Sequence, residues 1–104
     1  MAIAEISIVP IGTQSTSVSS YVAACLEVLK GSGLTHELHG MGTIIEGDLE
    51  DLFQIILEMH EVPFRAGALR VVTTIKIDDR RDKKTSAKGK VKAVLRKRSQ
   101  GQAS

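Results

Sequence analysis

The sequence predicts an α+β domain of the ferredoxin-like class, a βαββαβ sandwich with one extra helix at its C-terminal end. Segments with strand periodicity and segments with helix periodicity follow one another in that order, and a last helical segment follows them. The chain has 104 residues, of which 42% are hydrophobic and 25% charged, as in a globular domain. Without Trp, and with one Tyr and two Phe, its core must be aliphatic. We treat residues 1–98 as a single domain and residues 99–104 as a polar C-terminal tail.

The first half of the chain contains one long strand, one helix and two short strands. In residues 2–11 apolar side chains alternate with polar or mixed ones, which indicates a strand with one core face. A polar turn follows, in which Thr16 or Ser17 can cap a helix with an apolar stripe from Val18 to Leu29. Gly31 and Gly33 are expected to end that helix. Residues 35–39 and 42–46 are expected to form the two short strands, on either side of Gly40.

The second half repeats the pattern of a helix followed by a strand. A helix is expected to begin after Asp48 and to stop at Pro63. Residues 68–77 give the longest predicted strand, and a charged turn follows it. The third helix is expected over residues 86–98, with an apolar stripe of Val91, Val94 and Leu95.

One face of the predicted sheet is left without helices. Both main helices of this architecture cover the same face, so the second faces of the strands should form a bare surface. That surface is partly apolar and partly charged, and it consists of Glu5, Ser7, Val9, Ile44, Glu46, Arg70, Val72 and Thr74. We expect the antiparallel sheet to pack face to face with another subunit through it.

Glu46 is the most informative residue of the chain. It lies at the end of a strand, and Gly47 allows a sharp bend directly after it. A carboxylate at that place can face an open cleft. Two interpretations remain open: Glu46 binds a ligand, or it pairs with Arg70 across the sheet, because buried charges are rarely kept unpaired.

Three segments, residues 9–23, 41–49 and 63–83, resemble the thiamine-binding (YkoF-like) family of small cytosolic proteins. The resemblance spans nearly the whole chain, in the same order and with the same spacing. It implies a ferredoxin-like fold and tetramers built as pairs of dimers. It also implies non-enzymatic binding of thiamine or its hydroxymethylpyrimidine moiety, by a carrier or a sensor. No cofactor is implied besides this bound ligand.

The aminopyrimidine ring has a donor amine and ring-nitrogen acceptors, and its faces require apolar cover. A buried carboxylate can make two strong hydrogen bonds to it, and it suits the cationic thiazolium half as well. We therefore predict that Glu46 anchors the ring, with hydroxyls and apolar cover from nearby segments. The predicted ligand-binding residues are Glu46, Thr43, Thr13, Ser15, Ser17, Ile44, Val9, Phe64 and Arg70.

Two groups among these residues have simpler explanations. Thr43 lies three residues before Glu46, so it reaches the same side only if the strand bulges at Gly42 or Gly47; otherwise it is an ordinary strand threonine. Thr13, Ser15 and Ser17 can serve the turn and the helix cap alone.

Several classes of site are not expected. His36, His39 and His60 lack metal-ligand spacing, so we expect no metal site. The lone cysteine, Cys25, lies on an apolar helix stripe and is expected to be a core residue, which fits a reducing compartment. No stretch is long and apolar enough to span a membrane, and we expect a cytoplasmic protein.

Two alternatives to a carrier remain. One is a ligand-sensing regulatory module that acts on a partner protein. The other is nucleic-acid binding through the basic third helix. Three features argue against nucleic-acid binding: the acidic residues within the basic segment, the net charge of only +2 and the scarcity of aromatic side chains.

Overall fold

The computed structural model describes residues 1–12, 19–84 and 86–103, and the side chains only as far as residue 100. Three of the predicted ligand-binding residues, Thr13, Ser15 and Ser17, lie outside the described residues, as does the predicted helix cap at Thr16.

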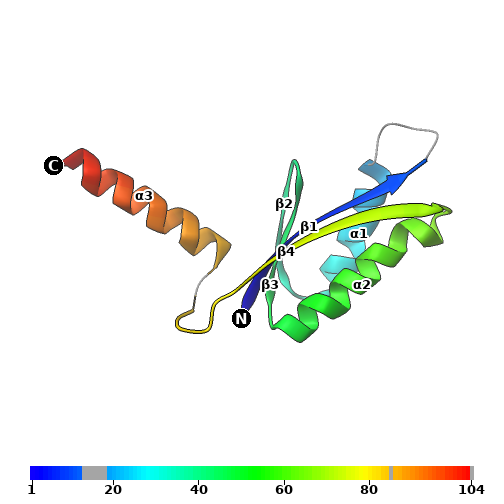
Figure 1. The fold of residues 1–104 in the computed structure, drawn as a ribbon, viewed down its shortest axis with the longest axis horizontal. Coiled ribbons are helices and arrows are strands. Elements are labelled where there is room, and N and C mark those ends of the chain that lie inside the picture. Colours follow the sequence, from blue (N-terminus) through cyan, green and yellow to red (C-terminus); the bar gives the residue numbers. More distant parts are fainter. Residues whose placement is uncertain (13–18, 85, 104) are drawn as a thin grey trace.

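The described chain forms one sheet and three helices, shown in Figure 1. The elements are β1 (Ala2–Ile11), α1 (Ser19–Ser32), β2 (Thr35–His39), β3 (Gly42–Gly47), α2 (Leu49–Arg65), β4 (Arg70–Asp79) and α3 (Ala87–Ala103). The four strands have the order β2-β3-β1-β4, and every neighbouring pair is antiparallel. The predicted ferredoxin-like α+β fold is confirmed.

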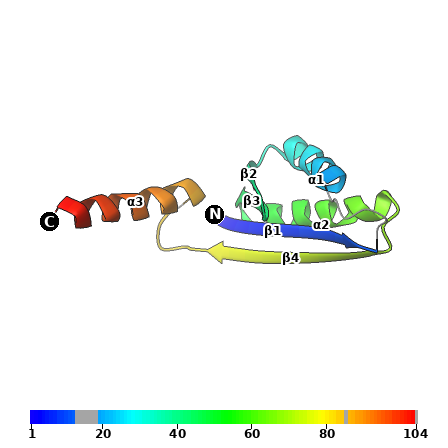
Figure 2. The same cartoon turned by 90° about the horizontal axis from the view of Figure 1, so that it is seen from above.

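The sheet is covered on one face only. Figure 2 shows α1 and α2 on the same side of β1 and β4, with the opposite face of these strands open. Alternation along β1 explains this arrangement, since Ala2, Ala4 and Ile6 are at most 2% exposed and face the helices. Leu29 of α1, Ile45 of β3 and Leu52 of α2 complete the centre of the core and are fully buried.

The strand register confirms which residues share the open face. Glu5 lies opposite Ile44, Ser7 opposite Thr74, and Val9 opposite Val72. Directly opposed residues in an antiparallel pair point to the same side. The side chains predicted for the bare face therefore do lie on one face of the sheet.

The helix ends differ from the predictions in two places. Pro63 does not stop α2, which continues to Arg65 with the proline in its last turn. A proline near a helix end removes only one backbone hydrogen bond, and the Pro63 carbonyl still accepts bonds from the Ala66 and Ala68 amides. Helix α3 extends to Ala103, beyond the predicted end at Arg98. Asp48 occupies the N-cap position of α2, although its side chain makes no capping hydrogen bond.

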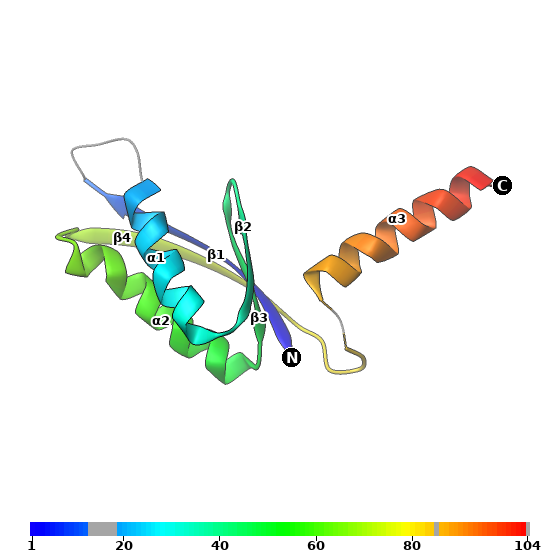
Figure 3. The same cartoon turned by 180° about the vertical axis from the view of Figure 1, so that it is seen from behind.

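Helix α3 stands away from the rest of the domain, as the view from behind in Figure 3 shows. Its three large apolar side chains, Val91, Val94 and Leu95, are 58%, 66% and 44% exposed. No helix within the described residues is both long and apolar enough to cross a membrane.

Replacing Leu52 by alanine should lower the free energy of unfolding by about 2–5 kcal/mol, because the cavity would form in a fully packed core. Thermal and urea unfolding measure this change. Leu69→Ala is the matched control, since Leu69 is 95% exposed and its truncation should change stability by no more than about 0.5 kcal/mol. Equal losses in the two variants would contradict the assignment of the core.

Candidate ligand-binding site

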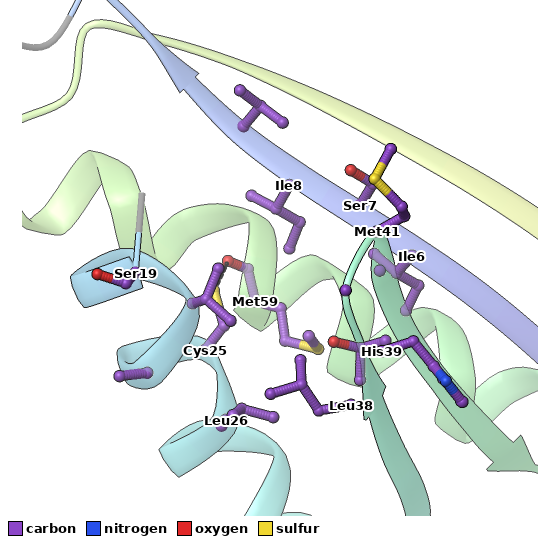
Figure 4. Close-up of a pocket in the computed structure, with 16 residues that line it drawn as sticks. Ile6, Ser7, Ile8, Ser19, Cys25, Leu26, Leu38, His39, Met41 and Met59 are labelled. Carbon is purple, nitrogen blue, oxygen red and sulfur yellow. Dashed lines mark hydrogen bonds between the residues drawn. The ribbon is translucent and has the colours of Figure 1, made fainter. Parts of the chain in front are cut away.

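A groove of about 700 Å³ lies on the helix-covered side of the sheet. It is bounded by α1, the middle of β1 and the hairpin of β2 and β3, with Met59 of α2 at its base. Figure 4 shows Cys25 and Leu26 of α1 facing Ile6 and Ile8 of β1 across this space. Small-molecule sites in proteins typically have volumes of about 300–1,000 Å³, so the groove has the size of a ligand site.

Apolar side chains make up most of the groove wall. Ile6, Ile8 and Leu38 point to the helix side because they hold every second position of their strands. At the rim, Met41 is 91% exposed and Leu38 is 51% exposed. Large apolar side chains left in water at the mouth of a groove can cover a flat ring, since burial of their apolar surface is favourable.

The polar groups in the groove are few. Thr43 of β3 is 7% exposed and is the buried polar residue of the described core. Ser19 and His39 also line the groove, and Ser7 borders it with its side chain on the open face. None of the described lining residues is acidic. The groove therefore suits a largely neutral, flat molecule better than a cation.

Cys25 contributes a thiol to the groove, and its environment follows from Pro63. A proline has no amide hydrogen, so residue 63 leaves the carbonyl of Met59, four residues earlier, without its helical donor. The Sγ of Cys25 donates to that Met59 oxygen at 3.4 Å. Burial raises the pKa of the Cys25 thiol. The thiol is thus held in its protonated form and fills a gap in the hydrogen bonding of α2.

Thr43 and Glu46 do not share a site. The pairing of β1 with β3 is regular from Ala2↔Gly47 to Ile6↔Thr43, so no bulge turns the strand. Residues three positions apart on a regular strand face opposite sides. Thr43 faces the groove, whereas Glu46 lies on the open face.

The structure gives Glu46 a partner that the sequence did not indicate. Its Oε1 accepts a hydrogen bond of 2.5 Å from the Ala87 amide, the first N–H of α3. Ser86 caps the same helix, because its Oγ accepts a bond from the Gly89 amide at 2.9 Å. An ion pair between Lys90 and Asp78 of β4 adds a further contact. Glu46 thus holds the N-terminus of α3, where a carboxylate is favoured by the helix dipole.

The alternative pairing of Glu46 with Arg70 across the sheet is wrong. Glu46 lies opposite Ile3 of β1, whereas Arg70 lies opposite Ile11 at the far end of the same strand. Eight residues of extended chain separate these two positions, roughly 26 Å at about 3.3 Å per residue.

The remaining predicted residues are spread over three places. Val9 borders the groove, but its side chain lies on the open face opposite Val72, and the residue is 37% exposed. Ile44 lies on the open face with Glu46. Phe64 lies near the end of α2, where its ring meets that of His60 edge to face at 5.5 Å, and Arg70 begins β4. Of the described predicted residues, the groove therefore takes only the side chain of Thr43, with Val9 at its border.

Sequence reasoning missed most of the groove. Cys25, Leu38, His39, Met41 and Met59 were not predicted to touch a ligand. Among these residues only Met41 could have been predicted from the sequence. It is an apolar residue between two glycines at a hairpin tip, where it cannot be buried in the core.

These features define a class of protein: a ferredoxin-like α+β domain with a ligand-sized apolar groove on its helix side. Residues 4–95 match the family model described as thiamine-binding protein, and the chain belongs to that family. It is similar to the UPF0045 protein YqgV of Bacillus subtilis, with 49% identity over 98 residues that cover 90% of this chain and 94% of the relative. It is also similar to a UPF0045 protein of Methanothermobacter thermautotrophicus, with 47% identity covering 93% of this chain and 99% of that protein.

Solved structures agree with the fold. The hypothetical protein MJ1052 of Methanocaldococcus jannaschii superposes with a TM-score of 0.81 at 40% identity, over 89% of this chain and 94% of that one. A Thermotoga maritima protein that is provisionally assigned to thiamine biosynthesis or salvage has a TM-score of 0.73 at 20% identity, over 88% of this chain and 97% of that one.

Cys25 should react slowly with a thiol reagent such as Ellman's reagent in the native protein at neutral pH. The raised pKa and the burial both reduce the accessible thiolate. Because the pKa of Cys25 is raised, the rate should rise steeply only when the pH exceeds the ordinary pKa of a thiol. Unfolding in guanidinium chloride should make the reaction immediate. Absorbance at the wavelength of the released thiolate follows the reaction. Native labelling as fast as that of the unfolded chain would contradict the described environment.

Proposed function

We propose that this chain binds thiamine or its hydroxymethylpyrimidine half in the cytosol and releases it unchanged, as a carrier or a sensor. The observation that carries the proposal is the ligand-sized apolar groove beside Thr43 in a chain of the thiamine-binding protein family. A Thermotoga maritima protein that is provisionally assigned to thiamine biosynthesis or salvage shares this fold.

The pyrimidine half fits the chemistry of the groove. It is flat and largely neutral, its faces can lie between Ile8 and Leu26, and the Thr43 hydroxyl can donate to or accept from its polar edge. The cationic thiazolium finds no carboxylate among the described lining residues. In this proposal the thiazolium therefore points to the rim and to water, and the groove recognises the pyrimidine.

Glu46 offers a second place for the ligand, on the open face. Its carboxylate suits a cation, and Ile44 on the same face could cover a ring. A ligand there would have to replace the Ala87 amide at the carboxylate. We favour the groove because its space is already formed, whereas the place at Glu46 needs α3 to move.

The groove supports binding without a chemical step. Cys25 is the strongest nucleophile in its wall, yet the thiol is buried, its pKa is raised and it donates to the Met59 carbonyl. A group held in this way serves packing better than attack on a ligand.

Self-association through the open face is part of the proposal. Val9 and Val72 lie opposite each other on that face and are 37% and 44% exposed. Packing two such faces together would remove this apolar surface from water. Glu46 would then lie near the seam between subunits, so a site there would be completed by the second copy.

Thr43→Val should weaken the binding of hydroxymethylpyrimidine by about threefold to tenfold, which corresponds to one lost hydrogen bond. Isothermal titration calorimetry measures the affinity, and thiamine should behave similarly. Chromatography of the released ligand should recover it unchanged.

Glu46→Gln is the matched variant for the second location. If the ligand lies in the groove, this variant should change the affinity by less than twofold while loosening the first turn of α3. If Glu46→Gln weakens binding by tenfold and Thr43→Val has no effect, the site lies on the open face. No saturable binding by the wild-type protein would contradict the proposed function itself.

Ile44→Lys should reduce the assembly size measured by light scattering, because it places a charge at the centre of the open face. The control is Ala24→Lys, at an exposed position of α1. An unchanged assembly in Ile44→Lys would contradict face-to-face packing.

A further inference from the structure

The charge of the chain is divided between two parts of the sequence. Residues 1–79 contain eleven acidic and four basic side chains, a formal charge of −7. Residues 80–104 contain one acidic and ten basic side chains, a formal charge of +9. Helix α3 holds six of these basic side chains and no acidic one, and it forms one end of a molecule that is 56 Å long (Figure 1). The net charge of +2 therefore conceals a strongly basic C-terminal segment.

The acidic side chains closest in sequence to α3 are already paired. Each of the three at the end of β4 and in the turn after it has a basic partner within the described residues. The pairs are Asp78 with Lys90, Asp79 with Arg81, and Asp82 with Arg80. These pairs use only three of the ten basic side chains, so most of the positive charge of this segment is not neutralised by them.

Three other cations form a ridge along α3. Lys88, Lys92 and Arg96 follow one another at intervals of four residues, which places their side chains on the same side of the helix. All three are exposed, and none has an ion-pair partner within the part of the chain that the structure describes. We call these three residues the basic ridge. It is about 12 Å long, since an α-helix rises about 1.5 Å per residue.

The basic ridge is separate from the apolar stripe of α3. With 3.6 residues per helical turn, the centres of the two surfaces lie roughly 100° apart around the helix axis. A contact made by the ridge therefore does not require the apolar stripe, whatever covers that stripe.

We propose that the basic ridge binds the phosphate backbone of double-stranded DNA, without sequence preference. A DNA duplex carries one phosphate charge per about 1.7 Å of its axis, so a stretch of about 12 Å presents about seven charges to the three cations. The major groove of B-form DNA is about 12 Å wide and admits an α-helix. Figure 3 shows α3 clear of the sheet over most of its length, as such an approach requires. This function is additional to the proposed ligand site and does not depend on it.

Two other polyanions fit the basic segment less well. Proteins commonly hold single-stranded nucleic acids by stacking bases on aromatic side chains, and residues 80–104 contain no Phe, Tyr or Trp. Phosphates of a duplex need no such stacking. An anionic membrane favours a helix whose apolar face enters the bilayer between flanking cations. Helix α3 has only three large apolar side chains, and the basic ridge lies to one side of them.

The acidic part of the chain does not prevent the contact. At about 0.15 M ionic strength, exposed charges separated by more than about 8 Å are largely screened. The ridge therefore acts through the charges next to it, and no acidic residue follows Asp82 in the sequence. Repulsion between the duplex and residues 1–79 instead orients the molecule, with α3 toward the DNA and the sheet away from it.

The salt dependence of binding tests the basic ridge directly. Fluorescence anisotropy of a labelled, mixed-sequence DNA duplex measures the dissociation constant of the full chain. Three phosphate contacts predict that this constant rises about fortyfold between about 50 and about 200 mM salt. The combined variant Lys88→Gln, Lys92→Gln and Arg96→Gln should bind at least tenfold more weakly at the lower salt and lose most of the salt dependence. Glutamine has nearly the helix propensity of lysine and arginine, and circular dichroism checks that α3 is retained.

The matched control removes the same charge from α1, α2 and β4. It combines Lys30→Gln, Arg65→Gln and Lys76→Gln, at three exposed positions. This control should change the dissociation constant by less than twofold, and exchanging Lys for Arg and Arg for Lys at the ridge positions should leave it unchanged. Equal weakening by the ridge variant and the control would show an effect of net charge alone and would overturn the basic ridge.

Two further results would overturn the proposal. One is the absence of saturable duplex binding by about 100 µM wild-type protein at the lower salt, since non-specific DNA binding has dissociation constants of about 10⁻⁴–10⁻⁶ M even at physiological salt. The other is binding to vesicles of phosphatidylcholine and phosphatidylserine without binding to the duplex, which would make a membrane the partner of α3.

Discussion

The regular pairing of β3 with β1 is the constraint on which the functional interpretation depends. It fixes Thr43 and Ile45 on the helix side and Ile44 and Glu46 on the open side, without a bulge that could exchange them. The Thr43 hydroxyl and the Glu46 carboxylate, which are close in the sequence, therefore lie in two different environments. One environment is a groove with few charges, and the other is a half-apolar sheet surface with charged residues.

The open face follows from the number of helices that cover the sheet. Two helices over a four-stranded sheet can bury one face but not the other, and α3 does not complete the cover because it stands away from the sheet. Glu46 and Asp78 instead hold the first turns of α3 at the end of the sheet. The apolar stripe of α3, like the open face, is therefore left uncovered by the described residues of the same chain.

The fold was predictable because each element carries a local signal. Alternation along residues 2–11 predicted the central strand and its core face, and the order of elements then predicted the architecture. The end of α2 was predicted less well, because Pro63 in a last turn costs only one hydrogen bond, which the thiol of Cys25 partly offsets. The length of α3 was underestimated because the helix continues through Gly101 to Ala103, although glycine commonly ends a helix.

The candidate site was less predictable, because it depends on contacts between distant segments. Strand alternation already indicated that Thr43 and Glu46 face opposite sides, and the bulge that would have joined them is absent from the described strand. The hydrogen bond from the Ala87 amide to Glu46 joins residues 41 positions apart, so no local sequence pattern could predict it. The groove likewise arises from the offset of α1 relative to the β2–β3 hairpin, a tertiary feature that residue spacing does not encode.

The most direct test of the central claim is a crystal structure of the protein grown with hydroxymethylpyrimidine. The account predicts electron density for the ring between α1 and the β2–β3 hairpin, within hydrogen-bond distance of the Thr43 hydroxyl. Density for the ring beside Glu46 on the open face, with the groove closed by its own side chains, would contradict it.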